Sequence, residues 1–146
     1  MKGKVVAVCR SAEKGKPKED VHSGFFERGL GLIGDAHAGT GKQVSILAQE
    51  RVEELAGQTG LSFPPGAFAE NLLIKGVDQA EWIPGKRLRV GRALLQIEQI
   101  GKEAGSSHSY HYQGYSLLPH YGIFASVVEA GLVKNGDTAE ILNSFP

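Results

Sequence analysis

Short apolar runs separated by glycines, prolines and polar turns follow one another along most of the chain. In residues 86–90, Leu88 and Val90 alternate with Arg87 and Arg89, which is the period of a β-strand with one face in water. The runs that predict strands are residues 5–9, 43–47, 71–74, 86–90, 93–100, 123–128 and 139–142. Turn sequences lie beside several of these runs: Pro-Gly at 84–85, Gly-Arg at 91–92 and Asn-Gly-Asp at 135–137.

One segment changes to a helical period. In residues 48–58, Val52, Leu55 and Ala56 recur three or four positions apart among charged residues, so the pattern predicts an amphipathic helix that a glycine at 57 or 60 can end. Strands and helices do not alternate regularly along the chain. We therefore expect a mainly β fold with one or two short helices, either a sandwich or a closed or partly closed β-barrel, rather than a parallel α/β sheet.

Length and composition indicate one globular domain over residues 1–146, since 41% of the residues are hydrophobic and 22% are charged. Sixteen basic residues balance sixteen acidic ones, so we expect neither nucleic acid nor an anionic membrane as partner. No apolar stretch has the length of a membrane span or a signal peptide, and a single cysteine agrees with a reducing compartment. The sequence thus predicts a soluble cytoplasmic protein. The basic run Lys14, Lys16 and Lys18 is interrupted by polar and acidic residues and predicts a solvated loop.

Three sequence motifs suggest a binding or catalytic function that their sequence context does not support. Residues 29–34 match G-x-G-x-x-G, but a glycine-rich loop follows instead of the helix that a dinucleotide site needs. His108 and His111, with His120 further on, have no second cluster of metal ligands, so solvent-facing or hydrogen-bonded histidines are expected and no metal site is assigned. Cys9 falls on the strand face shared by Val5 and Ala7, which predicts a buried thiol.

Four segments together carry a specific pattern: GDAHAG at 34–39, QVSILAxE at 43–50, FAENL at 68–72 and IGKE at 100–103. With GIFA at 122–125, Gly131 and KxGD at 134–137, this set resembles the MOSC domain family over nearly the whole chain. That family comprises the C-terminal module of eukaryotic molybdenum-cofactor sulfurases and small stand-alone bacterial proteins. The resemblance implies a closed barrel like the small barrel domain of pyruvate kinases.

The resemblance also implies the molybdenum cofactor (molybdopterin) as ligand, through sulfur transfer or a redox reaction, and a desulfurase or a molybdoenzyme as protein partner. Nothing in the chain resembles the pyridoxal phosphate site of the desulfurase domain. At the position after Gly-Lys-Glu, where the family carries its sulfur-bearing cysteine, this chain has Ala104. An alanine methyl group cannot hold a persulfide, so no catalytic residue is assigned. Lys42 stands where an arginine is expected, which weakens bidentate recognition of an anion.

The same segments suit a small anionic ligand on physical grounds. Six glycines between residues 24 and 41 allow close backbone approach to a pterin phosphate, and lysines and polar side chains nearby supply charge and hydrogen bonds. The residues expected to bind the cofactor are Asp35, His37, Lys42, Gln43, Glu70, Asn71, Lys102 and His108. Alternatively, Asp35 and Asn71 satisfy the backbone of turns and Glu70 pairs with a lysine.

Three functions remain open at this stage. The first is a domain that binds a molybdenum–pterin species, or another anionic sulfur–metal species, without a covalent step. The second is a sulfur-transfer enzyme of molybdenum-cofactor metabolism, which Ala104 argues against. The third is a metal-assisted hydrolase that uses His37, His108 and Asp35, a hypothesis that only the types of these residues support.

Overall fold

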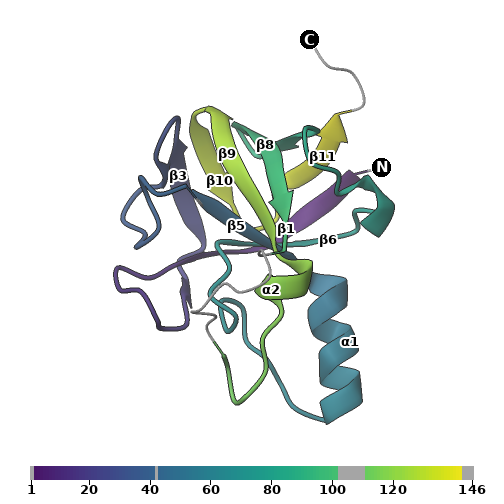
Figure 1. The fold of residues 1–146 in the computed structure, drawn as a ribbon. Helices are drawn as coiled ribbons and strands as arrows, with labels where there is room; N and C mark the ends of the chain where they lie inside the picture. Colours follow the sequence, from purple (N-terminus) through teal and green to yellow (C-terminus); the bar gives the residue numbers. More distant parts are fainter. Residues whose placement is uncertain (1, 42, 102–110, 143–146) are drawn as a thin grey trace.

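Seven strands close into a barrel in this computed structural model, which describes residues 2–41, 43–101 and 111–142 (Figure 1). Around that barrel the described strands run in the order β1 (Lys2–Arg10), β11 (Thr138–Leu142), β7 (Arg87–Val90), β8 (Ala93–Ile100), β9 (Ile123–Glu129), β5 (Val44–Ala48) and β6 (Leu72–Lys75). β6 pairs with β1 and completes the circle. Neighbouring strands are antiparallel except β5 and β6, which are parallel. The expected closed β-barrel is confirmed.

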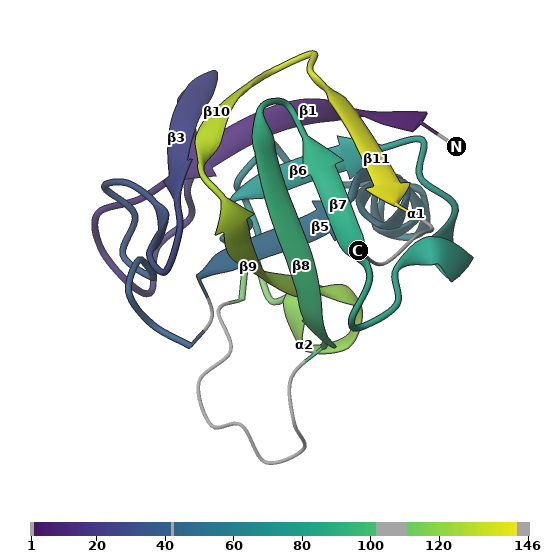
Figure 2. The same ribbon diagram turned by 90° about the horizontal axis from the view of Figure 1, so that it is seen from above.

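A small second sheet covers one part of the barrel. It consists of β10 (Gly131–Lys134), β3 (Ser23–Glu27) and β4 (Gly31–Leu32), and Figure 2 shows β10 and β3 side by side next to β1 and β8. A two-residue strand, β2 (Glu19–Asp20), pairs with the end of β1. Phe26, Leu32 and Val133 of the small sheet are fully buried in the main core. The hydrophobic pattern does not predict this sheet, because its strands are short and interrupted by glycine.

Two apolar cores lie on the two sides of the barrel wall. Val44, Ile46 and Leu72 belong to the core inside the barrel, whereas Leu47 and Leu73 belong to a second core outside it. The outer core is covered by α1 (Gln49–Thr59), α2 (Leu118–Tyr121) and the segment 63–68, and a 3₁₀ turn, η1 (Gln79–Glu81), lies elsewhere on the surface. Every residue of β5 is buried because both of its faces are covered.

A bulge in β1 assigns its residues to the two cores. The pairing of β1 with β6 shifts between Val5 and Ala7. As a result Val5 and Val8 point into the barrel, while Ala7 and Cys9 lie in the outer core. Burial of Cys9 is confirmed, but its predicted common face with Val5 is wrong, because an extra residue in a strand reverses the alternation of side chains.

The predicted helix is confirmed as α1. Gly60 ends it with a φ of 73°, and its N–H donates to the carbonyl oxygen of Ala56 at 2.8 Å. This left-handed conformation is one that glycine adopts without strain. α2 is a single turn with Pro119 in its first residues and has no period long enough to be seen in the sequence. No helix among the described residues is long and apolar enough to cross a membrane.

Candidate functional site

A lysine from the basic run is buried at the end of β1. Lys14 and Lys16 are exposed, as a solvated loop predicts, but the prediction is wrong for Lys18, of which 4% is exposed. The Lys18 ammonium lies 2.7 Å from Oδ1 of Asp35, and both side chains are almost completely inaccessible to solvent. A buried ammonium is stable only when an opposite charge and hydrogen bonds compensate for its lost hydration. Asp35 supplies that compensation here.

The main chain around Lys18 is held in place by a close approach to Gly66. The N–H of Lys18 donates to the carbonyl oxygen of Gly66 at 2.9 Å. A Cβ at Gly66 would collide with the Lys18 carbonyl, and Gly66 has a φ of 85°. Glycine is therefore required at this contact. The sequence alone gives no sign of it, since the two residues are far apart along the chain.

Asp35 has several donors around its carboxylate. Besides Lys18, the N–H of Ser11 donates to Oδ1 at 3.2 Å and the N–H of His37 donates to Oδ2 at 3.0 Å. Burial by itself would raise the pKa of Asp35, but hydrogen bonds from His37 and Lys18 and the Lys18 charge outweigh it and hold the pKa below its usual range. Asp35 is thus an ionised internal partner whose oxygens are already engaged.

His37 is the member of this group that reaches solvent, because 38% of its side chain is exposed. Its Nδ1 lies 3.3 Å from the Lys18 Nζ and 3.7 Å from Oδ2 of Asp35. An ammonium has only donors, so a hydrogen bond from Lys18 requires an unprotonated Nδ1. In the tautomer that accepts from Lys18, the ring proton sits on Nε2; in the other, Nδ1–H faces Asp35. We name Lys18, Asp35 and His37 the polar triad.

Glu70 lies completely buried beside the polar triad. Its two oxygens accept from the N–H groups of Gly66 at 2.8 Å and Phe68 at 3.1 Å. Burial raises the pKa of Glu70 to about 7, although these hydrogen bonds and the Lys18 charge act against that rise. The direct partners of Glu70 are therefore backbone amides of the turn before it, and Lys18 acts on it through space.

Asn71 and Gln43 connect strands. Asn71 Oδ1 accepts from the N–H of Ser45 at 3.0 Å, and its Nδ2 donates to the carbonyl oxygen of Cys9 at 3.2 Å. Asn71 thereby ties β1 to β5, with 0% of the residue exposed. The Oε1 of Gln43 accepts from the N–H of Val127 at 3.2 Å. The predicted group of site residues thus divides: Asp35, His37 and Glu70 gather around Lys18, whereas Asn71 and Gln43 make contacts between strands.

Cys9 is the one cysteine in the sequence, and it is buried with 0% exposed. Burial raises the pKa of its thiol, the negative charges of Glu70 and Asp20 raise it further, and the Lys18 charge lowers it only in part. Since the thiolate is the nucleophilic form, Cys9 is inert in the folded protein.

Two glycines of the glycine-rich segment are used for close packing. A Cβ at Gly31 would collide with the Gln43 carbonyl, and one at Gly24 would collide with the Leu32 side chain. Gly31 thus lets β4 lie against the residue before β5, and Gly24 lets β3 lie against β4. Lys42, Lys102, Ala104 and His108 lie outside the described residues.

No group of three His, Cys, Asp or Glu side chains within residues 2–41, 43–101 and 111–142 is placed to hold a metal ion. Asp35 and His37 are adjacent, as the hydrolase hypothesis requires. However, the oxygens of Asp35 are engaged by Lys18, Ser11 and His37, so a metal ion would have to displace the ammonium. The donors of the polar triad suit an anion better than a cation.

Solved structures share the fold of the chain. YuaD from Bacillus subtilis superposes with a TM-score of 0.75 at 20% identity, over 97% of this chain and 96% of that one. YiiM from Geobacillus stearothermophilus gives 0.69 at 19% identity (97% and 75%), and YiiM from Escherichia coli gives 0.67 at 22% identity (99% and 71%). A search of curated proteins gave no match.

The family comparison falls on the segment that carries the site. Residues 34–101 match the model of the MOSC domain, and this segment contains Asp35, His37 and Glu70. Together with the closed barrel, this match confirms the resemblance to the MOSC domain family that the sequence predicts.

Proposed function

We propose that the protein binds an anionic molybdenum–pterin species, or a related anionic sulfur–metal species, at the solvent edge of the polar triad. The observation that carries this proposal is the buried Lys18–Asp35 pair with the half-exposed His37 beside it. Two partners of the Lys18 ammonium are Asp35 and His37, so one of its three hydrogens has no partner among the described residues. A buried donor of this kind favours an incoming anion.

The donor set fits the phosphate and oxo groups of a molybdenum cofactor. Lys18 supplies a positive charge, and the partly exposed His37 ring presents an Nε2–H donor in the tautomer that accepts from Lys18. Asp35 holds both residues in place through its carboxylate. When bound, the molybdenum centre would supply redox chemistry. The residues of this chain would bind and orient it.

Covalent sulfur transfer is not part of the proposal. Cys9 is inaccessible and its thiol pKa is raised, and alanine occupies position 104. A sulfur carrier needs an accessible thiolate that accepts and releases sulfane sulfur. The proposed protein therefore holds its ligand by noncovalent contacts.

The test is to purify the full chain from a host supplied with molybdate, and to measure molybdenum by elemental analysis and pterin by mass spectrometry. His37→Ala should lower the occupancy of both about tenfold, the loss of one charge-assisted contact. His111→Ala, which changes an exposed histidine outside the triad, is the matched control and should leave the occupancy unchanged.

Two results would overturn the proposal. Folded wild-type protein that carries neither molybdenum nor pterin, and that does not bind added molybdate or pterin, would remove the cofactor. Zinc or iron without pterin would instead favour the hydrolase. Incubation with a desulfurase and labelled cysteine tests the sulfur-transfer alternative, and label on Cys9 would contradict its assignment to the core.

A further inference from the structure

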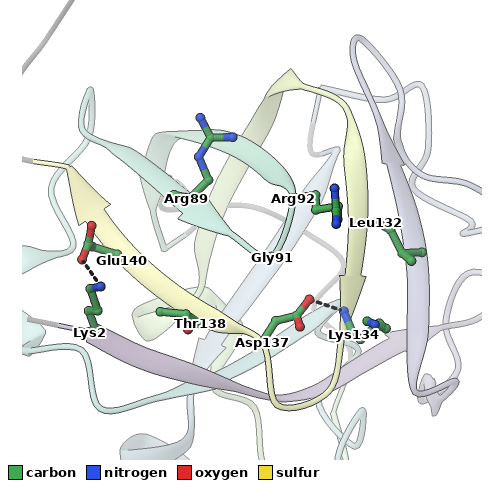
Figure 3. A pocket seen from close by; sticks show the side chains of 9 residues that line it. All are labelled: Lys2, Arg89, Gly91, Arg92, Leu132, Lys134, Asp137, Thr138 and Glu140. Atoms are coloured by element: carbon green, nitrogen blue, oxygen red, sulfur yellow. Dashed lines mark hydrogen bonds and ion pairs between the residues drawn. The ribbon is translucent and has the colours of Figure 1, made fainter.

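A second polar feature lies on the outer wall of the barrel, between β10 and β11. Figure 3 shows these two strands diverging from the turn at Asp137, with the β7–β8 turn at Gly91 between them. The hollow that results has a volume of about 580 Å³, within the range of small-molecule sites. Its lining consists of Lys2, Arg89, Gly91, Arg92, Leu132, Lys134, Asp137, Thr138 and Glu140.

Hydrogen bonds fix the backbone around this hollow. The N–H of Gly91 donates to the carbonyl oxygen of Thr138, and the N–H of Arg92 donates to that of Leu132, each at 3.1 Å. A Cβ at Gly91 would collide with the Asp137 carboxylate, and the φ of Gly91 is 53°. The β7–β8 turn is therefore locked against both β10 and β11, so the hollow is formed before any ligand arrives.

The lining carries an excess of positive charge in a chain whose net charge is zero. Four cationic side chains face two carboxylates. Glu140 is paired with Lys2 at 3.8 Å, and the Asp137 carboxylate accepts from the N–H of Lys134 at 2.8 Å. The ion pair of Arg89 is with Glu129, at 3.5 Å.

Two of the cations, Arg92 and Lys134, form no ion pair within the described part of the chain. Among the described residues, no carboxylate lies within ion-pair distance of Arg92 or Lys134. They come from different elements, the β7–β8 turn and the end of β10, and both line the same hollow. Leu132, with 39% exposed, adds an apolar surface beside them. Two unpaired cations with an apolar side chain in the same hollow suit a phosphorylated organic molecule.

We propose that this hollow binds the phosphate or diphosphate group of a small phosphorylated molecule, held by Arg92 and Lys134. The site does not involve the polar triad and does not depend on the function proposed for it. Arg92 supplies a planar fork for two phosphate oxygens, and Lys134 supplies a point charge. Leu132 contacts the organic part of the ligand.

Pyrophosphate is the probe for the test. The ¹⁵N-labelled full chain is titrated with it at low ionic strength, where screening is weak, and amide shifts are followed by NMR. We expect the shifts to centre on residues 89–92 and 132–138. Arg92→Gln and Lys134→Gln should each raise the dissociation constant about tenfold. Lys75→Gln, an exposed lysine on β6 that does not line the hollow, is the charge-matched control and should leave the constant unchanged.

Four outcomes would overturn the proposal. The first is the absence of pyrophosphate binding at millimolar concentration. The second is a set of shifts confined to residues 18 and 35–40, which would place the anion at the polar triad. The third is equal affinity in wild type, Arg92→Gln and Lys134→Gln. The fourth is binding of an acidic peptide that pyrophosphate does not displace, which would identify the ligand of the hollow as a protein.

Discussion

Replacing Lys18 by methionine tests the charge pair on which the candidate site depends. Methionine has a similar length and is apolar, so it fills the space of the lysine stem but removes the ammonium. The substitution leaves the Asp35 carboxylate buried, with 0% of its side chain exposed and without its opposite charge. Two backbone donors remain, the N–H groups of Ser11 and His37.

The expected cost follows from this geometry. Removing one partner of a buried ion pair destabilises a protein by about 3–5 kcal/mol, and the two remaining hydrogen bonds place Lys18→Met near the lower limit, at about 3 kcal/mol. The sign of the pH dependence is also fixed. The pKa of Asp35 in the wild type is lowered from the usual 3.8, so its stabilising contribution is present above that pH and is lost as the pH falls below it. The difference between wild type and variant should therefore shrink in acid.

The assay is urea unfolding at neutral pH and near pH 3, followed by circular dichroism. Lys16→Met is the matched control: the same change in the same loop, where the pair with Glu13 has both side chains about two-thirds exposed. Such a surface pair contributes about 0–1 kcal/mol. If Lys18→Met costs no more than Lys16→Met at neutral pH, or if its cost grows in acid, the reasoning about the buried pair is wrong.

Three further predictions concern the residues around the pair. Because burial raises the pKa of Glu70 from 4.5 to about 7, the folded state holds this proton more tightly than the unfolded chain. The free energy of unfolding should therefore fall by about 3 kcal/mol as the pH rises between these two values. Urea unfolding of Glu70→Gln at several pH values should show a smaller fall. Cys9 should react with a thiol reagent only in step with unfolding, and rapid reaction in buffer would contradict its burial. Asn71→Ala should cost about 3 kcal/mol in urea unfolding, since it leaves buried partners on β1 and β5 unsatisfied, and a cost below about 1 kcal/mol would show that Asn71 does not tie these strands together.

Local patterns predict the parts of the fold that local contacts stabilise. The β7–β8 hairpin follows from alternating side chains and the Gly91-Arg92 turn, and α1 follows from its period and a closing glycine. β3, by contrast, pairs with β10, which lies more than a hundred residues later in the chain. Neither strand has a long alternating run, so the small sheet depends on a tertiary contact that no local pattern records.

The candidate site likewise has residues that the sequence predicts and residues that only the tertiary structure reveals. The segment around Asp35 and His37 is recognisable as a chemical pattern, and the structure places both residues together. Lys18 is missed because a lysine among charged and polar neighbours normally belongs to a solvated loop. Its burial depends on Asp35, seventeen positions away, and on the close approach of Gly66. The bulge in β1 is likewise invisible in the sequence, and it alone separates Cys9 from Val5.

The Lys18 charge acts on three acidic groups at once, and this links ligand binding to protons. It pairs directly with Asp35 and lowers the pKa of both Glu70 and Cys9 through space. An anion bound at the edge of the polar triad would offset part of that charge, so the pKa of Glu70 would rise further and the carboxyl group would take up a proton near neutral pH. By linkage, the same anion would then bind more tightly as the pH falls through the pKa of Glu70. Protonation of Glu70, which is held by the backbone of the buried turn before it, would thus be linked to ligand binding although Glu70 does not contact the ligand.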